Sequence, residues 1–506
     1  MGNNLITSMV FLPFVGALLQ AVLPASANRG GIAVGKWAAL GASIASSVCG
    51  MILVFSMRKQ TAEMQAVELI PWVGSYAISY EMAVDGINAL LILLMAIIFP
   101  LLISAEWEQK AGSRGMHGLL LILQTALLGA VCAQDLFLMF FFWSMSILPF
   151  YFLIGIWGGP GKETAAFRTI VAGAAGNALF FGALLLIYYS VDPHTFSLKE
   201  LSGGKLAGKT FLFLGRELQV SSVAFGLVCA GLALRAPVWP IHGWFTHAAE
   251  EAPASVFVAM SAAAVPVAAG LFMRLSYSLF PETVARAAQG IVIVGIVNLV
   301  MGGLCAMVQR GLRLLLAFIC LSGVGFILMG IGSLNPIGVV GATYQQLVLG
   351  LGVAGFGLFY GIVFDRTGGT EFADMKGSAI IGGIAPRAPA VALVAGLVIA
   401  SILGFPGMGG FVGQTLLMVG SYSIHPVAVI IAGVMILLAT YYLFMMYRYI
   451  FLGKQSGMAV EFIDLTVREK AYFVPLVASL LLFGLYPKPF IELVRPTALT
   501  LLSTIK

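Results

Sequence analysis

One arginine and one histidine stand beside two prolines inside a long apolar stretch of the sequence. Arg235 precedes Pro237 and Pro240, and His242 follows them, in the run LALRAPVWPIHGWF. Proline removes a backbone hydrogen bond that lipid cannot replace, so a membrane helix breaks in this way only where protein or water covers it. We therefore expect Arg235 to face a polar cavity or a partner, and His242 to be the nearby group that can titrate near neutral pH. Two simpler readings stay open, an arginine that snorkels to the membrane surface and a histidine that only makes a hydrogen bond.

A second interruption and a set of neutral polar side chains complete the candidate site. The run LGFPGMGGFVGQ breaks another apolar stretch at Pro406. The neutral polar residues inside apolar stretches are Ser144, Ser146, Asn177, Gln345, Gln346 and Gln414. Such side chains can order water along a hydrated path, or they can simply bond one helix to another at about 0.6 kcal/mol each. Gln345 and Gln346 are adjacent, so we expect only one of them to point inward.

Acidic residues and lysines are missing from the middle of every apolar stretch. A proton relay needs groups whose pKa lies near the working pH, and ionisable residues inside a membrane are costly enough to mark function where they occur. Arg235 can hold a positive charge there, but arginine does not release its proton in proteins. Any proton path in this chain is therefore expected to run through water held by neutral groups and Arg235, without a Lys and Glu relay.

Composition restricts the chain to one class of protein. Of its 506 residues 60% are hydrophobic and only 9% charged, which excludes a soluble enzyme. Runs such as 116–134 and 289–309 are apolar all round, which excludes the alternating pattern of a membrane β-barrel. The net charge of +6 comes from Lys and Arg in loops, so no nucleic acid is expected as a partner. The five cysteines lie in apolar runs without a CxxC pair, and we expect no metal, haem or iron–sulfur site.

The apolar runs predict an all-α polytopic membrane protein with about fourteen transmembrane helices. The expected spans are 5–23, 37–57, 86–105, 116–134, 135–157, 169–190, 219–234, 253–273, 289–308, 314–334, 338–364, 388–420, 425–447 and 471–487. The first lacks a basic leading region, so it is expected to be retained as a span. An even number places both termini on one side, and the excess of Lys and Arg in the opposite loops predicts that this side is not cytoplasmic.

The two interrupted spans indicate an internal repeat. Each is the fourth member of a set of five, spans 4–8 and spans 9–13, and an odd number of spans makes the second copy enter the membrane upside down, as in many transporters. The expected divisions are residues 1–115 with spans 1–3, 116–280 with the first repeat, 281–452 with the second, and 453–506 with the last span and a tail. Chance placement of prolines, which are common in membrane helices, is the alternative reading.

Four segments carry a resemblance to a known family. They are DLFLMFFFWSMSILPFYFLIGIWGG from Asp135, APVWPIHGWF from Ala236, RGLRLLLAF from Arg310, and GFPGMGGFVGQ from Gly404. Over nearly the whole chain the sequence resembles the antiporter-like subunits of respiratory complex I, in particular the M type. The resemblance implies fourteen spans, two inverted five-helix repeats with broken helices seven and twelve, and a membrane-embedded line of Lys, Glu and His that relays protons.

At the relay positions the chain departs from the family pattern. Ser144 stands where the family has a glutamate in helix five, Arg235 replaces the lysine of helix seven, and Val265 falls on the lysine of helix eight. Gly323 and Leu349 take the histidine positions of helices ten and eleven, and Gln414 takes the charged position of helix twelve. These departures imply that the relay is largely replaced.

The resemblance favours one role and leaves two others open. It implies a non-redox membrane-arm subunit of a complex I-type NADH:quinone oxidoreductase in the bacterial inner membrane, in contact with lipid and with other membrane subunits. Quinone, flavin and iron–sulfur clusters would belong to partner subunits, with no cofactor in this chain. The alternatives are a repurposed ion or inorganic-carbon transporter subunit, and a structural spacer in a related complex.

Overall fold

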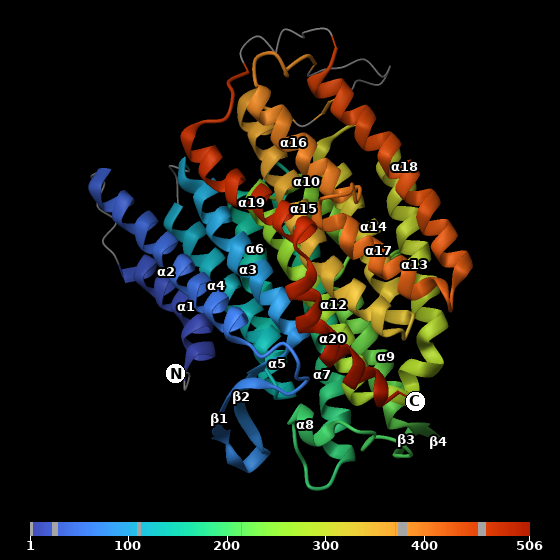
Figure 1. The fold of residues 1–506 in the computed structure, drawn as a ribbon. Coiled ribbons are helices and arrows are strands. Elements are labelled where there is room, and N and C mark those ends of the chain that lie inside the picture. Colours follow the sequence, from blue (N-terminus) through green and yellow to red (C-terminus); the bar gives the residue numbers. More distant parts are fainter. Residues whose placement is uncertain are drawn as a thin grey trace.

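A computed structural model describes residues 4–22, 29–108, 113–213, 215–369, 371–372, 382–453 and 462–505. Most of these residues form long helices that run roughly side by side through one bundle (Figure 1). The two chain ends lie at the same end of the bundle, and two small β-hairpins project there as well (Figure 1).

The N-terminal part consists of four helices and a hairpin, and one of these helices lies deep in the protein. Its elements are α1 (Leu5–Val22), α2 (Arg29–Ser56), β1 (Gln65–Val73), β2 (Ile78–Val84), α3 (Gly86–Ala105) and α4 (Ser113–Cys132). The hairpin of β1 and β2 anchors the start of α1, because the buried Glu68 carboxylate accepts hydrogen bonds from the backbone N–H groups of Ile6 at 2.8 Å and Thr7 at 3.0 Å. A carboxylate suits this place because the N–H groups at a helix start have no helical partner.

The next part contains the first broken helix. Its elements are α5 (Leu136–Met145), α6 (Ile147–Trp157), α7 (Lys162–Ser190), α8 (Leu198–Leu201), β3 (Thr210–Phe213), β4 (Arg216–Gln219), α9 (Val220–Ala233), α10 (Gly243–Glu251), α11 (Ala254–Val258), η3 (Ala259–Ala264, a π-helical segment) and α12 (Val265–Leu279). The chain breaks between α9 and α10 at Pro237 and Pro240, as the sequence indicates. The interruptions between α5 and α6 at Ser146, and at η3, were not expected.

The last part contains the second break. Its elements are α13 (Pro281–Met307), α14 (Leu312–Gly332), α15 (Pro336–Thr367), α16 (Pro389–Ile402), α17 (Gly409–Tyr422), α18 (Pro426–Phe451), α19 (Val467–Leu485) and α20 (Lys488–Ser503). The segment between α16 and α17 contains Pro406, and two glycines in it have positive φ, Gly404 at +71° and Gly407 at +90°. The tail predicted after Pro487 is the helix α20, which is bent by 67° from α19 and packs on α3 and α15.

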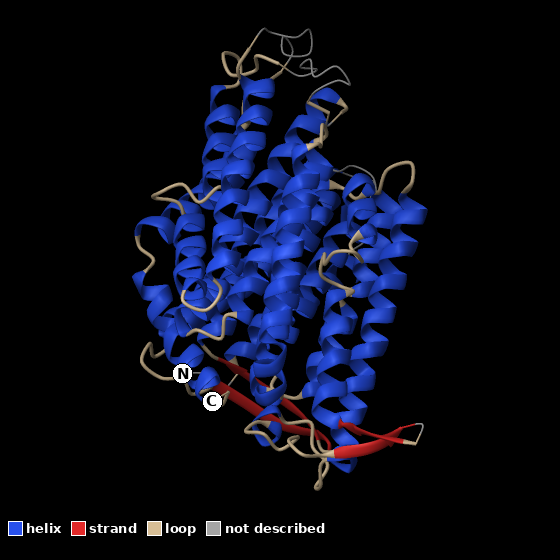
Figure 2. Cartoon of the chain, turned by 90° about the vertical axis from the view of Figure 1, so that its right-hand side faces the viewer, coloured by secondary structure: helices blue, strands red, loops and turns tan. Residues whose placement is uncertain are grey.

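The helices make this an integral membrane protein. Within the described residues, eleven helices are long and apolar enough to cross a membrane, or twelve if α19 and α20 count as one bent span. Two shorter apolar helices, α9 and α16, are the first halves of the broken segments. The chain is predominantly helical, as the sequence predicts, and the described residues also form two antiparallel hairpins that the sequence analysis does not predict (Figure 2). Most residues of β1 are exposed, whereas the last three residues of β2 are buried.

Three helical segments form the centre of the bundle. The helices α3 and α15, and the segment from α11 to α12, are the most completely buried of the candidate spans, whereas α1, α2, α7 and α18 lie outside. The central α15 contacts α3, α11, α14, α16, α17 and α19. It therefore touches both broken helical segments or their immediate neighbours, and it connects the two regions that carry the candidate site.

Candidate functional site

Arg235 is buried in the protein and has only neutral partners. It lies directly after α9 and is 7% exposed, so it does not snorkel to the surface. Its Nη1 donates a hydrogen bond to the carbonyl oxygen of Trp143 at 2.8 Å and a longer one to Oδ1 of Asn177 at 3.4 Å, and Nη2 donates to Oγ of Ser146. The guanidinium carbon also lies 3.8 Å from the centre of the Trp143 ring. Among the described residues no carboxylate forms an ion pair with Arg235.

Two local features place these partners around the arginine. The helix is interrupted at Ser146, between α5 and α6. The carbonyl oxygen of Trp143 accepts hydrogen bonds there from the Ser146 hydroxyl and from Nη1 of Arg235. Gly176 and Gly231 bring α7 and α9 together, since a Cβ added at Gly231 would lie 2.7 Å from the Gly176 carbonyl oxygen. Asn177 follows the first of these glycines, and Arg235 lies one turn after the second. Close contact of the two glycines therefore brings the arginine to the amide.

Ser144 does not take part in this cluster. Arg235 contacts Ser146, two residues further on, while the Ser144 hydroxyl is buried and has no hydrogen-bond partner among the described residues. A helix turn of 3.6 residues separates the directions of these two side chains by about 200°. A small cavity of ≈ 20 Å³ adjoins the arginine and is lined by Thr169, Trp244 and Arg235 among others. Its volume suits about one water molecule.

His242 lies near the same break without touching Arg235. It precedes α10, it is half-buried, and its ring lies 6.1 Å from that of Phe318, edge to face. Its Nδ1 has no hydrogen-bond partner among the described residues. The simpler reading of His242, a histidine satisfied by a hydrogen bond, therefore does not hold for Nδ1 within the described residues.

Asn298 holds the first broken helix in place. Its Oδ1 accepts a hydrogen bond from the backbone N–H of Trp239 at 2.8 Å, and its Nδ2 donates to the carbonyl oxygens of Pro237 at 3.1 Å and Leu321 at 2.8 Å. The side chain thus supplies partners for backbone groups at the break, two of them buried carbonyl oxygens. The sequence reading missed this residue, because Asn298 is one amide in an otherwise apolar run.

Gln414 makes a hydrogen bond across the second break. Its Nε2 donates a hydrogen bond to the carbonyl oxygen of Ile402, the last residue of α16, at 2.9 Å. The same glutamine lines a cavity of ≈ 40 Å³ with Gln345, Gly323 and Leu349. Positions 323, 349 and 414, which the sequence analysis compares with the charged positions of the family, therefore meet at one small cavity.

Both glutamines of α15 are buried, so the expectation that only one points inward was wrong. Gln345 faces α17, where a Cβ on Gly413 would lie 2.4 Å from its Oε1, and Gln346 faces α12, with its Oε1 3.2 Å from the corresponding point on Gly270. Adjacent residues diverge on a helix, but α15 is covered on all sides and both directions lead into protein. Neither amide atom of Gln346 has a hydrogen-bond partner among the described residues.

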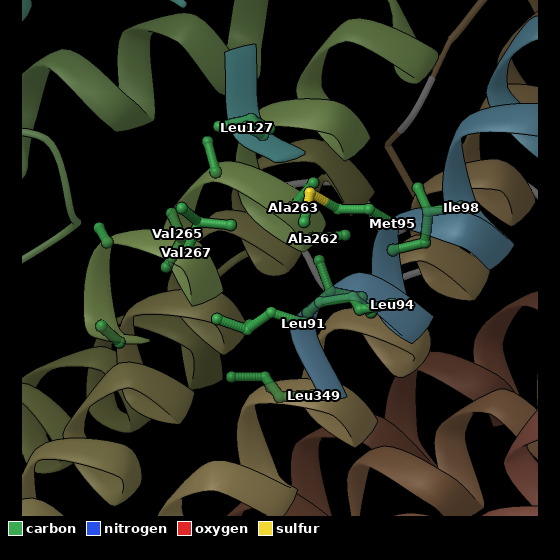
Figure 3. Packing of buried hydrophobic residues seen from close by; sticks show 14 of the residues in the cluster. Leu91, Leu94, Met95, Ile98, Leu127, Ala262, Ala263, Val265, Val267 and Leu349 are labelled. Atoms are coloured by element: carbon green, nitrogen blue, oxygen red, sulfur yellow. The ribbon is translucent and has the colours of Figure 1, made fainter. Parts of the chain in front are cut away.

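Between the two breaks the interior is mainly apolar, with Gln346 and Ser261 as buried polar residues. Val265 and Leu349 lie in a cluster with Leu91, Leu94 and Met95 of α3 (Figure 3). Leu349 occupies the space next to Gly323, since a Cβ on that glycine would lie 2.5 Å from a Leu349 methyl carbon. The Arg235 cluster and the Gln345–Gln414 cavity are thus connected through hydrocarbon side chains.

One buried ion pair lies outside the residues selected from the sequence. Nη2 of Arg274 on α12 donates to Oε1 of Gln134 at 2.8 Å and lies 3.5 Å from Oδ2 of Asp85, and both charged residues are buried. Asp85 also accepts hydrogen bonds at the start of α3. The sequence does not distinguish a buried Arg274 from a surface arginine, because this residue directly follows the predicted span 253–273.

A larger polar cavity opens at the end of the bundle away from the termini. It measures ≈ 520 Å³, and its charged lining residues are Glu106, Glu251, Arg313, Asp365, Arg468 and Glu469. Glu251 accepts a hydrogen bond from the Gly161 N–H at 2.8 Å, and Glu106 accepts one from Ser255. No group of three or more His, Cys, Asp or Glu side chains among the described residues is arranged to hold a metal ion.

Comparisons with known proteins agree with the architecture. Residues 133–446 match the family described as "NADH:quinone oxidoreductase/Mrp antiporter, TM". The chain is 29% identical to NADH-quinone oxidoreductase subunit M of Rhodobacter capsulatus over 98% of this chain and 96% of that one, and 33% identical to an NAD(P)H-quinone oxidoreductase chain 4 of Nostoc sp. over 96% and 88%.

Solved structures share the fold at lower identity. A chain of respiratory complex I from Thermus thermophilus superposes with a TM-score of 0.86 at 22% identity, covering 99% of this chain and 100% of that chain. A chain of the Mrp complex from Dietzia sp. gives 0.82 at 20% identity, covering 99% and 100%. The resemblance found in the sequence motifs is confirmed, and the chain belongs to the family of antiporter-like membrane subunits shared by NADH:quinone oxidoreductases and Mrp antiporters.

Proposed function

We propose that this chain is an antiporter-like membrane-arm subunit of a complex I-type NADH:quinone oxidoreductase in a bacterial inner membrane. The observation that carries the proposal is similarity over nearly the full chain to relatives named subunit M and chain 4 of such enzymes. In this role the chain carries no redox cofactor, and quinone, flavin and iron–sulfur clusters belong to partner subunits. Its own part is in proton translocation coupled to electron transfer elsewhere.

The proposed topology has fourteen spans. The eleven long helices, the two broken segments α9–α10 and α16–α17, and α19 together make this number. Spans 4–8 and 9–13 form two inverted repeats, each with its break in the fourth member. Both termini lie outside the cytoplasm, which agrees with their position at one end of the bundle (Figure 1).

In the proposed mechanism Arg235 is a fixed charge and does not relay a proton. The guanidinium donates hydrogen bonds to a backbone carbonyl, a hydroxyl and a side-chain amide. None of these groups takes up a proton at neutral pH. Any transfer then depends on water near Arg235 and His242 on one side and near Gln345 and Gln414 on the other. The apolar cluster at Val265 and Leu349 supports the view that the family's charged relay is largely replaced in this chain.

Purification from native membranes tests the proposal. The full chain, tagged and extracted in mild detergent, is expected to bring down quinone-reducing and nucleotide-binding subunits, and the same fraction is expected to oxidise NADH with a quinone acceptor. Copurification with cation-antiporter subunits or with one soluble partner, without NADH oxidation, would instead identify a repurposed transporter subunit. An intact oxidoreductase whose pumping stoichiometry is unaffected by substitutions throughout both polar regions would leave the chain as a spacer.

A further inference from the structure

A cavity at the outer edge of the bundle has a basic rim. It measures ≈ 390 Å³ and lies between the adjoining ends of α13 and α14 and the last turns of α18. The polar residues that line it are Gln309, Arg310, Tyr441, Tyr442, Arg448 and Tyr449. The last turns of α18 lie at the end of the bundle away from the two termini (Figure 1). The cavity shares one lining residue, Tyr442, with the small cavity beside Gln414, and its other lining residues are different.

The lining residues of this cavity carry two positive charges, from Arg310 and Arg448. Arg310 and Arg448 are exposed, and neither has a side-chain ion pair or hydrogen bond among the described residues. The lining contains no acidic residue. By contrast, Arg366 pairs with Glu469 at 2.7 Å and Arg286 with Glu282 at 3.4 Å. Two cations with free donors and a concave surface between them favour an anionic ligand.

The walls and floor of the cavity suit a ligand with an apolar part. Phe372 forms one wall, since its N–H donates to the Arg310 carbonyl oxygen at 2.9 Å and its ring lies 6.3 Å from that of Tyr449. The floor includes the side chains of Ala306 and Met446, which are buried. The rim of the cavity is therefore polar, and its floor is formed by apolar side chains.

The cavity also continues an apolar outer surface. Along α18 the side chains of Val434, Leu437 and Phe444 are 58%, 72% and 56% exposed, as expected for a helix that faces lipid. That surface ends at Arg448 and Tyr449, and tyrosine and arginine at the end of a membrane helix mark the level of the lipid headgroups. A molecule that binds here has its charged group at the headgroup level and its apolar part along α18.

We propose that this cavity binds an anionic phospholipid. The phosphate lies between Arg310 and Arg448, where charge-assisted hydrogen bonds hold it, and an acyl chain follows the exposed face of α18. Basic pockets between membrane helices are suited to such headgroups. The proposal does not depend on the role assigned to the chain in electron transport, because it concerns the outer surface of a single subunit.

Native mass spectrometry of the purified full-length protein tests this site. Phosphatidylglycerol and phosphatidylcholine are offered to the wild type, to the double variant Arg310→Gln/Arg448→Gln, and to Arg168→Gln, which alters an exposed arginine on α7. We expect the wild type and Arg168→Gln to retain phosphatidylglycerol preferentially, and the double variant to bind it roughly tenfold more weakly while phosphatidylcholine is unaffected. The variant Arg310→Lys/Arg448→Lys, which keeps the charge, is expected to recover most of the preference.

Three results would overturn the proposal. One is an unchanged lipid preference in the double variant. Another is an equal loss in Arg168→Gln, which would mean a diffuse charge effect. The third is displacement of bound phosphatidylglycerol by millimolar inorganic phosphate, which would identify the ligand as a soluble anion. Thermal unfolding of each variant in the same detergent separates these results from a failure to fold.

Discussion

Arg235 makes two different contacts with Trp143. Its guanidinium carbon lies 3.8 Å from the ring centre, and its Nη1 donates a hydrogen bond to the carbonyl oxygen of the same residue. One side chain thus uses both its flat face and its edge. Only a planar guanidinium can stack and donate in this way, so a lysine would not be an equivalent replacement. Since Ser146 and Asn177 supply the other contacts, the charge is stabilised entirely by dipoles and by the aromatic ring.

Arg235→Lys is therefore expected to lower stability although the charge is kept. The ammonium group loses the stacking and at least one hydrogen bond, and we expect a cost of about 2 kcal/mol. Scanning fluorimetry of the detergent-solubilised protein measures the change as a lower Tm. Arg168→Lys is the matched control, because that arginine is exposed on α7. If Arg235→Ala assembles normally and leaves NADH-driven proton pumping unchanged, Arg235 has no part in the mechanism.

Ser146→Ala and Ser144→Ala form a second matched pair. Ser146 is bonded to Arg235, and its loss leaves a buried cationic donor without a partner, at a cost of about 1–3 kcal/mol. The Ser144 hydroxyl has no partner to lose among the described residues, so its removal is expected to leave the Tm unchanged or to raise it. The same fluorimetric assay distinguishes the two. An equal loss in both variants would mean that Ser144 binds a group that the structure does not contain.

We expect the protein to lose stability when the side-chain amide at either helix break is removed. Asn298→Leu deletes three hydrogen bonds to Trp239, Pro237 and Leu321, whereas Gln414→Leu deletes one to Ile402. Because the carbonyl oxygens of Pro237 and Leu321 stay buried, Asn298→Leu should cost more, about 2–4 kcal/mol. Trypsin cleavage and the Tm of the two variants report the difference. A smaller loss for Asn298→Leu than for Gln414→Leu would contradict the assignment of Asn298 as the main support of the first break.

The sequence indicated the breaks but not the groups that stabilise them. Proline has no backbone N–H and therefore removes a helical hydrogen bond. For this reason the interruptions at Pro237, Pro240 and Pro406 can be predicted from a single sequence. Asn298 is 59 residues from Trp239 along the chain, and only the packing of the helices brings them together. The Trp143 carbonyl is a backbone atom, so no residue type marks it as the acceptor for Arg235.

The same limitation explains the error on the two glutamines. The periodicity of a helix predicts that neighbours such as Gln345 and Gln346 diverge, and they do. It cannot show that α15 is surrounded by protein, since that depends on α3, α12, α14 and α17. Likewise both Ser144 and Ser146 are candidates in the sequence, and the rotation of the helix decides that Ser146 reaches the arginine.

Gln346→Met is expected to stabilise the protein. Both amide atoms of Gln346 are buried without a partner among the described residues, and such a group costs about 1–3 kcal/mol of folding free energy. Methionine has a similar length and no such penalty, so the Tm should rise. A lower Tm would show that the amide is satisfied by water in the membrane, and would place a hydrated site between α12 and α15.

Val265→Lys tests whether the centre of the protein is dry. Val265 is fully buried, and its neighbours in the cluster include Leu91 and Leu349 (Figure 3). A charged lysine inside a membrane helix costs about 2.5–3.5 kcal/mol, and here the cluster offers it no partner. We expect less assembled protein and a lower Tm, whereas Val265→Met, of similar length but neutral, should be close to wild type. A lysine variant that folds with a native Tm would mean that water reaches this position. Its proton-pumping stoichiometry would then show whether one titratable group is enough to restore a relay through the apolar centre.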